Sequence, residues 1–106
     1  MNKYIMIMST FDNMEELEKL SSILLEKRLV SCTQVSTIKS TYYWKDELVT
    51  ADEYLLRMKT KKILYSDVEK VILENHSYEV PQIVAYDISM GYSEYLKWID
   101  KETKER

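Results

Sequence analysis

The sequence contains one cysteine and one histidine, the two side chains best suited to bind a soft or borderline metal ion. A thiolate and an imidazole are typical ligands of copper and zinc. Cys32 and His76 are far apart in sequence, and no second cysteine or histidine stands beside either at ligand spacing. Cys32 also fits a strand interior as a small apolar residue, and His76 fits the last turn of a helix, beside its free carbonyls. The residues alone leave both interpretations open.

Three adjacent aromatic residues, Tyr42, Tyr43 and Trp44, stand directly before a polar connection at residues 45–47. If this connection is the tip of a hairpin, the rings form an apolar patch that a partner must cover. We therefore expect an oligomer interface or a ligand cleft there. In the alternative interpretation, the strand curls back and some of the rings complete the core of the subunit.

Residues that could perform catalysis are few. The sequence has neither a glycine-rich phosphate loop nor a G-x-S-x-G motif. Asp52 and Glu53 form an acidic pair, which we interpret as a solvated surface because charged residues make up 31% of the chain. We expect a protein that binds and assembles and is not an enzyme. A small enzyme that uses a cleft between subunits is the alternative.

Strands and helices that follow one another closely must position these residues, since the chain has one glycine and one proline. Val, Thr, Ile and Tyr favour extended chain, and Leu, Ile and Val at helical spacing indicate helices. The order strand, helix, long hairpin, helix, strand, short helix is that of the split βαβ, or ferredoxin-like, α+β fold. The predicted strands are residues 3–9, 30–44, 48–59 and 81–88. The predicted helices run from a cap at Asp12 to about Lys27, from a cap at Thr60 to about Asn75 and from a cap at Ser93, with a frayed tail at 101–106.

The predicted hairpin is longer than the helices that must cover the sheet. Residues 48–59 span about 40 Å as a strand, whereas a helix of about 14 residues covers only about 21 Å. The tip of the hairpin should therefore project beyond the helices. No glycine stands at its turn, so Asp46 is the residue that we expect to adopt a positive φ there.

Length and composition indicate one domain, residues 1–106, with a hydrophobic content of 45% that is sufficient for one core. A net charge of -3 argues against nucleic acid as a partner, because neutralising phosphates requires an excess of Lys and Arg. The apolar runs are shorter than the roughly 20 residues that cross a bilayer, so we expect no membrane insertion. A single cysteine forms no internal disulfide, and we expect a cytoplasmic protein.

Five segments of the sequence carry a family resemblance. The first contains the cysteine, and the second contains the aromatic hairpin. The third is a strand that ends in Lys-Thr, and the fourth has a histidine followed by Tyr and Pro. The fifth is a closing Y-L-x-W motif. They are Lys27–Val35, Ser40–Lys45, Glu53–Thr60, His76–Ile83 and Tyr95–Ile99. In these segments the chain resembles the CutA divalent-cation tolerance family across nearly its whole length.

The resemblance implies a PII-like homotrimer of ferredoxin-like subunits, in which hairpins and terminal segments join neighbouring subunits. It also implies a role in tolerance of divalent cations, copper(II) in particular, with Cys32 and His76 as metal ligands. It further implies a small-ligand cleft between subunits and an aromatic subunit interface. The implied cleft residues are Trp44, Lys59, Tyr78 and Glu79, and the implied interface residues are Tyr42, Tyr43, Trp44 and Trp98.

The sequence departs from the family pattern at positions that affect chemistry. Ser77 stands where the family usually has proline, and Gln82 where it usually has glutamate. An uncharged amide supplies no carboxylate to a metal ion and no acidic proton. Gln82 therefore cannot perform any role that requires that carboxylate.

Overall fold

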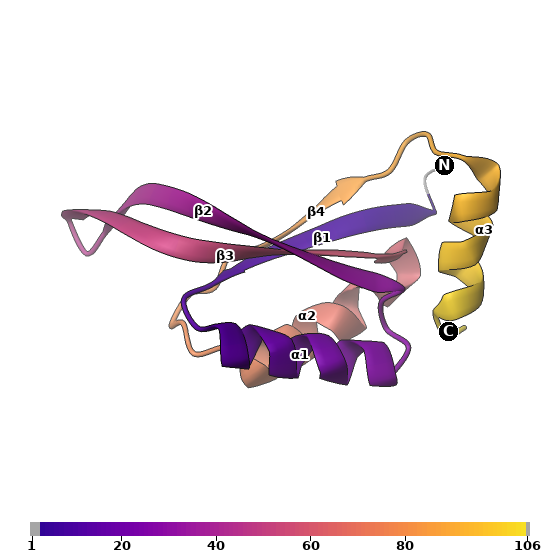
Figure 1. The fold of residues 1–106 in the computed structure, drawn as a ribbon, viewed down its shortest axis with the longest axis horizontal. Coiled ribbons are helices and arrows are strands. Elements are labelled where there is room, and N and C mark those ends of the chain that lie inside the picture. The colour runs from indigo at the N-terminus through magenta and orange to yellow at the C-terminus, as the bar shows by residue number, and fades with distance from the viewer. Residues whose placement is uncertain (1–2, 106) are drawn as a thin grey trace.

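The sheet of this protein has four antiparallel strands in the order β2-β3-β1-β4 (Figure 1). The structure, a computed structural model, describes residues 3–105. Its arrangement of strands and helices confirms the ferredoxin-like α+β fold predicted from the sequence. The elements are β1 (Tyr4–Phe11), α1 (Met14–Glu26), β2 (Cys32–Trp44), β3 (Glu47–Lys61), the short 3-10 helix η1 (Lys62–Leu64), α2 (Tyr65–Asn75), β4 (Ile83–Asp87) and α3 (Ser93–Glu102).

The core lies between one face of the sheet and helices α1 and α2, which run beneath that face in Figure 1. Side chains of β1 alternate between the two faces, and Ile5, Ile7 and Phe11 point into the core. Apolar residues at helical spacing on the facing sides of the helices pack against them. The buried apolar residues of α1, η1 and α2 are Leu17, Leu20, Leu24, Leu64, Val68, Val71 and Ile72.

β1 is longer than predicted, and this moves the start of α1. The strand continues to Phe11, whose ring is fully buried, so the helix cap is Asn13 and not Asp12. The side chain of Asn13 accepts a 3.0 Å hydrogen bond from the backbone N–H of Glu16. A short polar residue followed three positions later by glutamate occurs in both registers, so this motif alone could not separate them.

The predicted helix cap at Thr60 is also wrong, because β3 continues past it to Lys61. The side chain of Thr60 is buried and donates a 2.6 Å hydrogen bond to the backbone carbonyl of Leu29. At the last helix, the cap position is Tyr92, and Ser93 is the first residue within α3.

The β2-β3 hairpin extends past both helices, as predicted (Figure 1). Its strands pair without a break up to Trp44 opposite Glu47. The two-residue turn has a positive φ at Asp46 (66°), as predicted, and also at Lys45 (50°). Positive φ at both central residues is the requirement of the type I′ turn, whose twist matches that of the flanking strands.

Helix α3 stands at the end of the sheet opposite the hairpin tip (Figure 1). The chain that follows it is docked and not frayed. The backbone N–H of Lys104 donates to the carbonyl of Arg28 at 2.8 Å, and Thr103 is buried. Arg106, at the end of the predicted tail, lies outside the described residues. Within residues 3–105, neither α3 nor any other helix is long and apolar enough to cross a membrane.

An ionic cluster fixes α3 to the sheet. The carboxylate of Asp100 lies 2.9 Å from the Nζ of Lys3 and 3.7 Å from the Nζ of the buried Lys61. The hydrogen bond from Lys3 is the main cause that lowers the pKa of the Asp100 carboxyl below its usual value.

Candidate functional site

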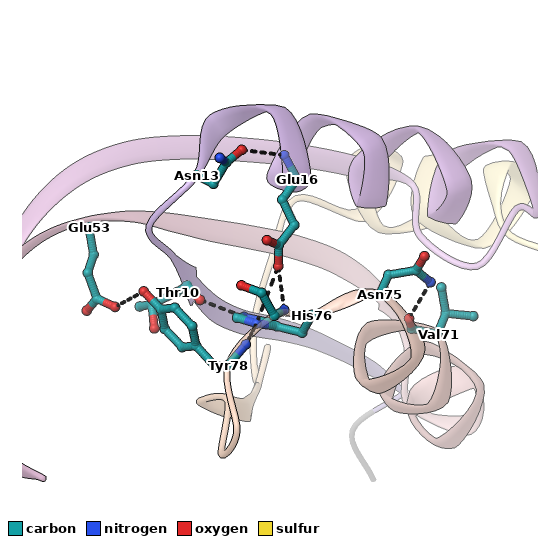
Figure 2. A network of polar contacts seen from close by, with 9 residues as sticks. Thr10, Asn13, Glu16, Glu53, Val71, Asn75, His76 and Tyr78 are labelled. Atoms are coloured by element: carbon teal, nitrogen blue, oxygen red, sulfur yellow. Dashed lines mark hydrogen bonds and ion pairs between the residues drawn. The ribbon is translucent and has the colours of Figure 1, made fainter.

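His76 follows the last residue of α2 and points away from that helix, toward the end of β1 (Figure 2). Its Nε2 lies 2.7 Å from the backbone carbonyl oxygen of Thr10, and its ring stacks on Phe11 with centroids 4.2 Å apart. The alternative interpretation, in which His76 lies beside the carbonyls of the last helical turn, is wrong, because its ring nitrogens bond Thr10 and Tyr78. Asn75 takes that place, and its side-chain amide donates to the Val71 carbonyl at 2.8 Å. His76 instead joins the connection between α2 and β4 to the sheet.

The hydrogen bonds of His76 use both nitrogens of its ring. The backbone N–H of Tyr78 donates to Nδ1 at 3.1 Å. Nδ1 therefore carries no hydrogen, and Nε2 donates its hydrogen to the Thr10 carbonyl. The side chain is only 1% exposed. Metal ligation by His76 would require one of these two hydrogen bonds to break.

Glu16 of α1 holds the same connection from a second side. Its carboxylate accepts a 2.6 Å hydrogen bond from the backbone N–H of Ser77 and lies 3.7 Å from the Nδ1 of His76 (Figure 2). A proline at position 77 would lack this N–H. The serine at this position thus allows a direct tie between α1 and the connection.

Tyr78 reaches from the connection to the hairpin, where its hydroxyl donates a 2.7 Å hydrogen bond to the carboxylate of Glu53 (Figure 2). Burial, together with this hydrogen bond, raises the pKa of the Tyr78 hydroxyl well above its usual value. Tyr78 therefore keeps its proton and acts as a donor. Glu53 is 6% exposed, so the interpretation of Asp52 and Glu53 as a solvated pair is wrong for Glu53. Adjacent strand residues point to opposite faces, which separates the two carboxylates.

A cavity of about 600 Å³ lies beside the outer half of the hairpin, between β2, β3, the end of β1 and the connection that carries Tyr78. This volume is within the range of about 300–1,000 Å³ that is typical of small-molecule sites. Besides Ser and Thr hydroxyls, the walls include two carboxyl groups, three aromatic rings and one amide. These belong to Asp12 and Glu53, to Tyr42, Trp44 and Tyr78, and to Gln82.

The aromatic residues of the hairpin lie on two sides of the strands. Tyr42 and Trp44 line the cavity, whereas Tyr43 is 76% exposed on the other face. These three rings are outside the buried core, so the alternative in which they complete it is wrong. Glu79 lies near the same tip, where its carboxylate pairs with the Nζ of Lys45 at 3.7 Å.

Cys32 lies at the opposite end of the hairpin, beside α3. Its Sγ is 3.8 Å from the hydroxyl of Tyr95, and the Tyr95 ring stacks with Trp98 at a centroid distance of 5.7 Å. Lys59 pairs with Cys32 in the sheet, donates a 3.0 Å hydrogen bond to the side chain of Gln34 and lies over the ring of Tyr95. A second group of predicted residues, Cys32, Lys59 and Trp98, is therefore gathered here.

One subunit does not bring all the predicted cleft residues together. Trp44, Tyr78 and Glu79 belong to the hairpin end, whereas Lys59 is at the Cys32 end. The stretch of β2 that separates Cys32 from Trp44 spans about 40 Å when extended. A cleft with all four cleft residues requires a second subunit and stays a prediction.

The predicted metal ligands, Cys32 and His76, are also apart. Cys32 pairs with Lys59 on one side of β3, whereas His76 is bonded to Thr10 on the other side, where Thr10 pairs with Leu55. Along β3, Lys59 and Leu55 are four residues apart, which corresponds to about 13 Å. Within residues 3–105, no three His, Cys, Asp or Glu residues are grouped so that they could hold a metal ion. The described part of one subunit therefore does not form a three-donor metal site from these residue types.

Neither Asp12 nor Glu53 is among the site residues predicted from the sequence. Asp12 is predicted as a helix cap and Glu53 as a solvated charge. The position of Glu53 could have been inferred from the alternation of side chains along its strand. Tyr54 packs against the core, so Glu53, the residue before it, must face the other side of the sheet. For Asp12, the position beside the cavity depends on where β1 ends.

Comparison with known proteins identifies the family. The family model of the CutA1 divalent ion tolerance protein matches residues 5–102 of the chain. This chain belongs to that family. It is 32% identical to the divalent-cation tolerance protein CutA of Pyrococcus horikoshii over 100 residues, which are 94% of this chain and 98% of that protein. The structure of the periplasmic divalent cation tolerance protein CutA from Archaeoglobus fulgidus is similar with a TM-score of 0.92, at 33% identity, over 95% of this chain and 99% of that one.

The names of the matched family and of these two relatives describe divalent-cation tolerance and state no enzymatic reaction. A relative from Oryza sativa, 31% identical over 95% of this chain and 58% of its own length, is named as chloroplastic, and the Archaeoglobus protein is described as periplasmic. Family members are thus described from more than one compartment. The cytoplasmic location of this chain stays a prediction.

We expect His76→Ala to lower the free energy of unfolding by about 3 kcal/mol, because it removes a buried ring and two hydrogen bonds. His76→Phe keeps a ring against Phe11 and should cost less, about 1–2 kcal/mol. Urea unfolding at one fixed protein concentration measures both changes. Equal stability of His76→Ala and the native chain would contradict the anchoring role of His76.

Proposed function

We propose that the protein is a cytoplasmic homotrimer that binds a small ligand at the hairpin cavity and contributes in this way to divalent-cation tolerance. The observation that carries the proposal is the hairpin, which projects past the helices (Figure 1) and carries large apolar side chains that are exposed. At its tip, Tyr43 and Leu48 are 76% and 63% exposed. Covering such a surface with a partner is favourable.

A second copy of the chain offers a matching surface at its α3 end. Tyr95 and Trp98 are stacked there and partly exposed. A contact between the hairpin tip of one copy and α3 of the next is head-to-tail, and contacts of this type can close into rings. In such a ring, Lys59 of one copy would lie near Trp44 of another, which would unite the cleft residues implied by the family resemblance.

Binding is proposed in preference to catalysis. The names of the family and of the Pyrococcus relative describe tolerance of divalent cations and no reaction. The polar side chains of the cavity are carboxylates, hydroxyls, an amide and the indole of Trp44. The alternative, a small enzyme in the cleft between subunits, would be favoured by turnover that stops when Trp44, His76 or Glu79 is altered.

The native chain is expected to have the mass of a trimer in sedimentation equilibrium. Trp44→Glu should lower that mass toward the monomer, because the proposed subunit contact would bury an unpaired charge at the hairpin, which is costly. Leu73→Glu is the matched control: Leu73 is also an exposed apolar residue but lies on α2, away from the hairpin, and its substitution should leave the trimer intact. A monomeric native chain would contradict the proposal.

For the divalent cation we propose Cys32 as the first ligand, with copper(II) as the ion that the family resemblance implies. The thiol is free and half-buried, and thiolates favour copper. Because residues 3–105 of one subunit group no three such donors, further ligands would come from neighbouring subunits. His76, the second predicted ligand, joins only if it gives up one of its two hydrogen bonds.

Titration of Cu(II) against a competing chelator tests this assignment. Cys32→Ser should remove tight binding, whereas His76→Phe, which preserves the ring packing, should keep it. Zn(II) serves as a control that does not oxidise thiols. If the native chain binds copper no better than Cys32→Ser does, Cys32 is not a ligand.

A further inference from the structure

Glu53 is a buried carboxylate without a cationic partner among the residues that the structure describes. It is 6% exposed, and its hydrogen-bond donor is the hydroxyl of Tyr78. A neutral hydroxyl offsets part of the cost of burying a carboxylate, and a positive charge nearby would offset more. Since Glu53 lines the cavity, that charge can be supplied by a molecule bound there.

The wall of the cavity has the composition of a site for an organic cation. Asp12 and Glu53 supply negative charge, and no lysine, arginine or histidine of the described chain lines the cavity. Tyr42, Trp44 and Tyr78 supply aromatic rings, whose faces attract cations. Carboxylates and aromatic rings together form the cages that bind quaternary ammonium groups.

Lys45 shows that a cation is accommodated beside this wall. The Nζ of Lys45 lies 5.7 Å from the centre of the Trp44 ring and is paired with Glu79. Lys45 belongs to the exposed turn and does not line the cavity. Within one subunit, it therefore leaves the carboxylate of Glu53 without a counter-charge.

We propose that the cavity binds a small organic ammonium ion, with its cationic group between Glu53 and the aromatic rings of Tyr42 and Trp44. This inference rests on the proposed function, because it assigns a ligand class to the same cavity. A metal ion fits these walls less well, since indole and phenyl rings are not ligands for divalent ions and the described residues group no three His, Cys, Asp or Glu donors.

Isothermal titration calorimetry of the native chain with choline tests the proposal. The matched control ligand is 3,3-dimethylbutan-1-ol, which replaces the quaternary nitrogen with carbon and has nearly the same shape without the charge. Choline should bind saturably and about tenfold or more tightly than the neutral alcohol, because only the cation interacts with the carboxylates and ring faces.

Two variants change the charge of the wall in opposite directions. Glu53→Gln keeps an oxygen that can accept from Tyr78 but removes the carboxylate, and should weaken choline binding about tenfold. Gln82→Glu adds a carboxylate to the wall and should strengthen choline binding several-fold. Because Gln82 is exposed, Gln82→Glu should fold normally. It therefore tests ammonium binding even if Glu53→Gln does not fold.

The proposal is overturned if choline binds no more tightly than the neutral alcohol, or if choline affinity does not rise in Gln82→Glu. Sedimentation equilibrium on the same samples separates this failure from failure of the proposed function. If the protein is a trimer but does not bind choline, only the proposed ammonium ligand is refuted. If the protein is a monomer, the proposed trimeric function is refuted. A side chain of a neighbouring copy found inside the cavity of the assembled protein, such as Lys59 paired with Glu53, would also overturn the proposal.

Discussion

The unbroken pairing of β2 with β3 is the interaction on which the rest of this structure depends. It extends from Cys32 to Trp44, farther than the helices that cover the sheet (Figure 1). One end of the hairpin is therefore packed beside α3, while the other lies beyond the core and presents aromatic side chains to solvent. The cavity, the exposed rings and the separation of Cys32 from Trp44 all follow from this length.

The cavity also needs its outer wall, the connection between α2 and β4. That segment is not part of a helix or a strand, and polar contacts hold it in place (Figure 2). His76 attaches it to β1, Glu16 attaches it to α1, and Tyr78 attaches it to Glu53 of the hairpin. A residue first considered as a metal ligand thus has a structural task that uses both of its ring nitrogens. The departure to serine at position 77 contributes the N–H that Glu16 binds.

The elements and the projecting hairpin could be predicted because hydrophobic spacing and strand length are local properties of a sequence. The positive φ of Asp46 followed from the absence of glycine at the turn. Contacts between distant segments could not be predicted in this way. The direction of His76, the burial of Glu53 and the distance between Cys32 and His76 are decided by which strand ends meet. The helix cap at Asn13 was ambiguous because the same capping motif fits two registers.

The central claim is that other copies of the chain cover the hairpin beyond α1 and α2. Hydrogen–deuterium exchange of residues 40–50, at a protein concentration at which the native chain is assembled, tests it most directly. β2 is an edge strand of the described sheet, so part of its amides face away from β3. The account predicts that these outward amides exchange slowly in the assembled protein and rapidly after dilution to the monomer. Rapid exchange of these outward amides in the assembled protein would show an uncovered hairpin and would contradict the account.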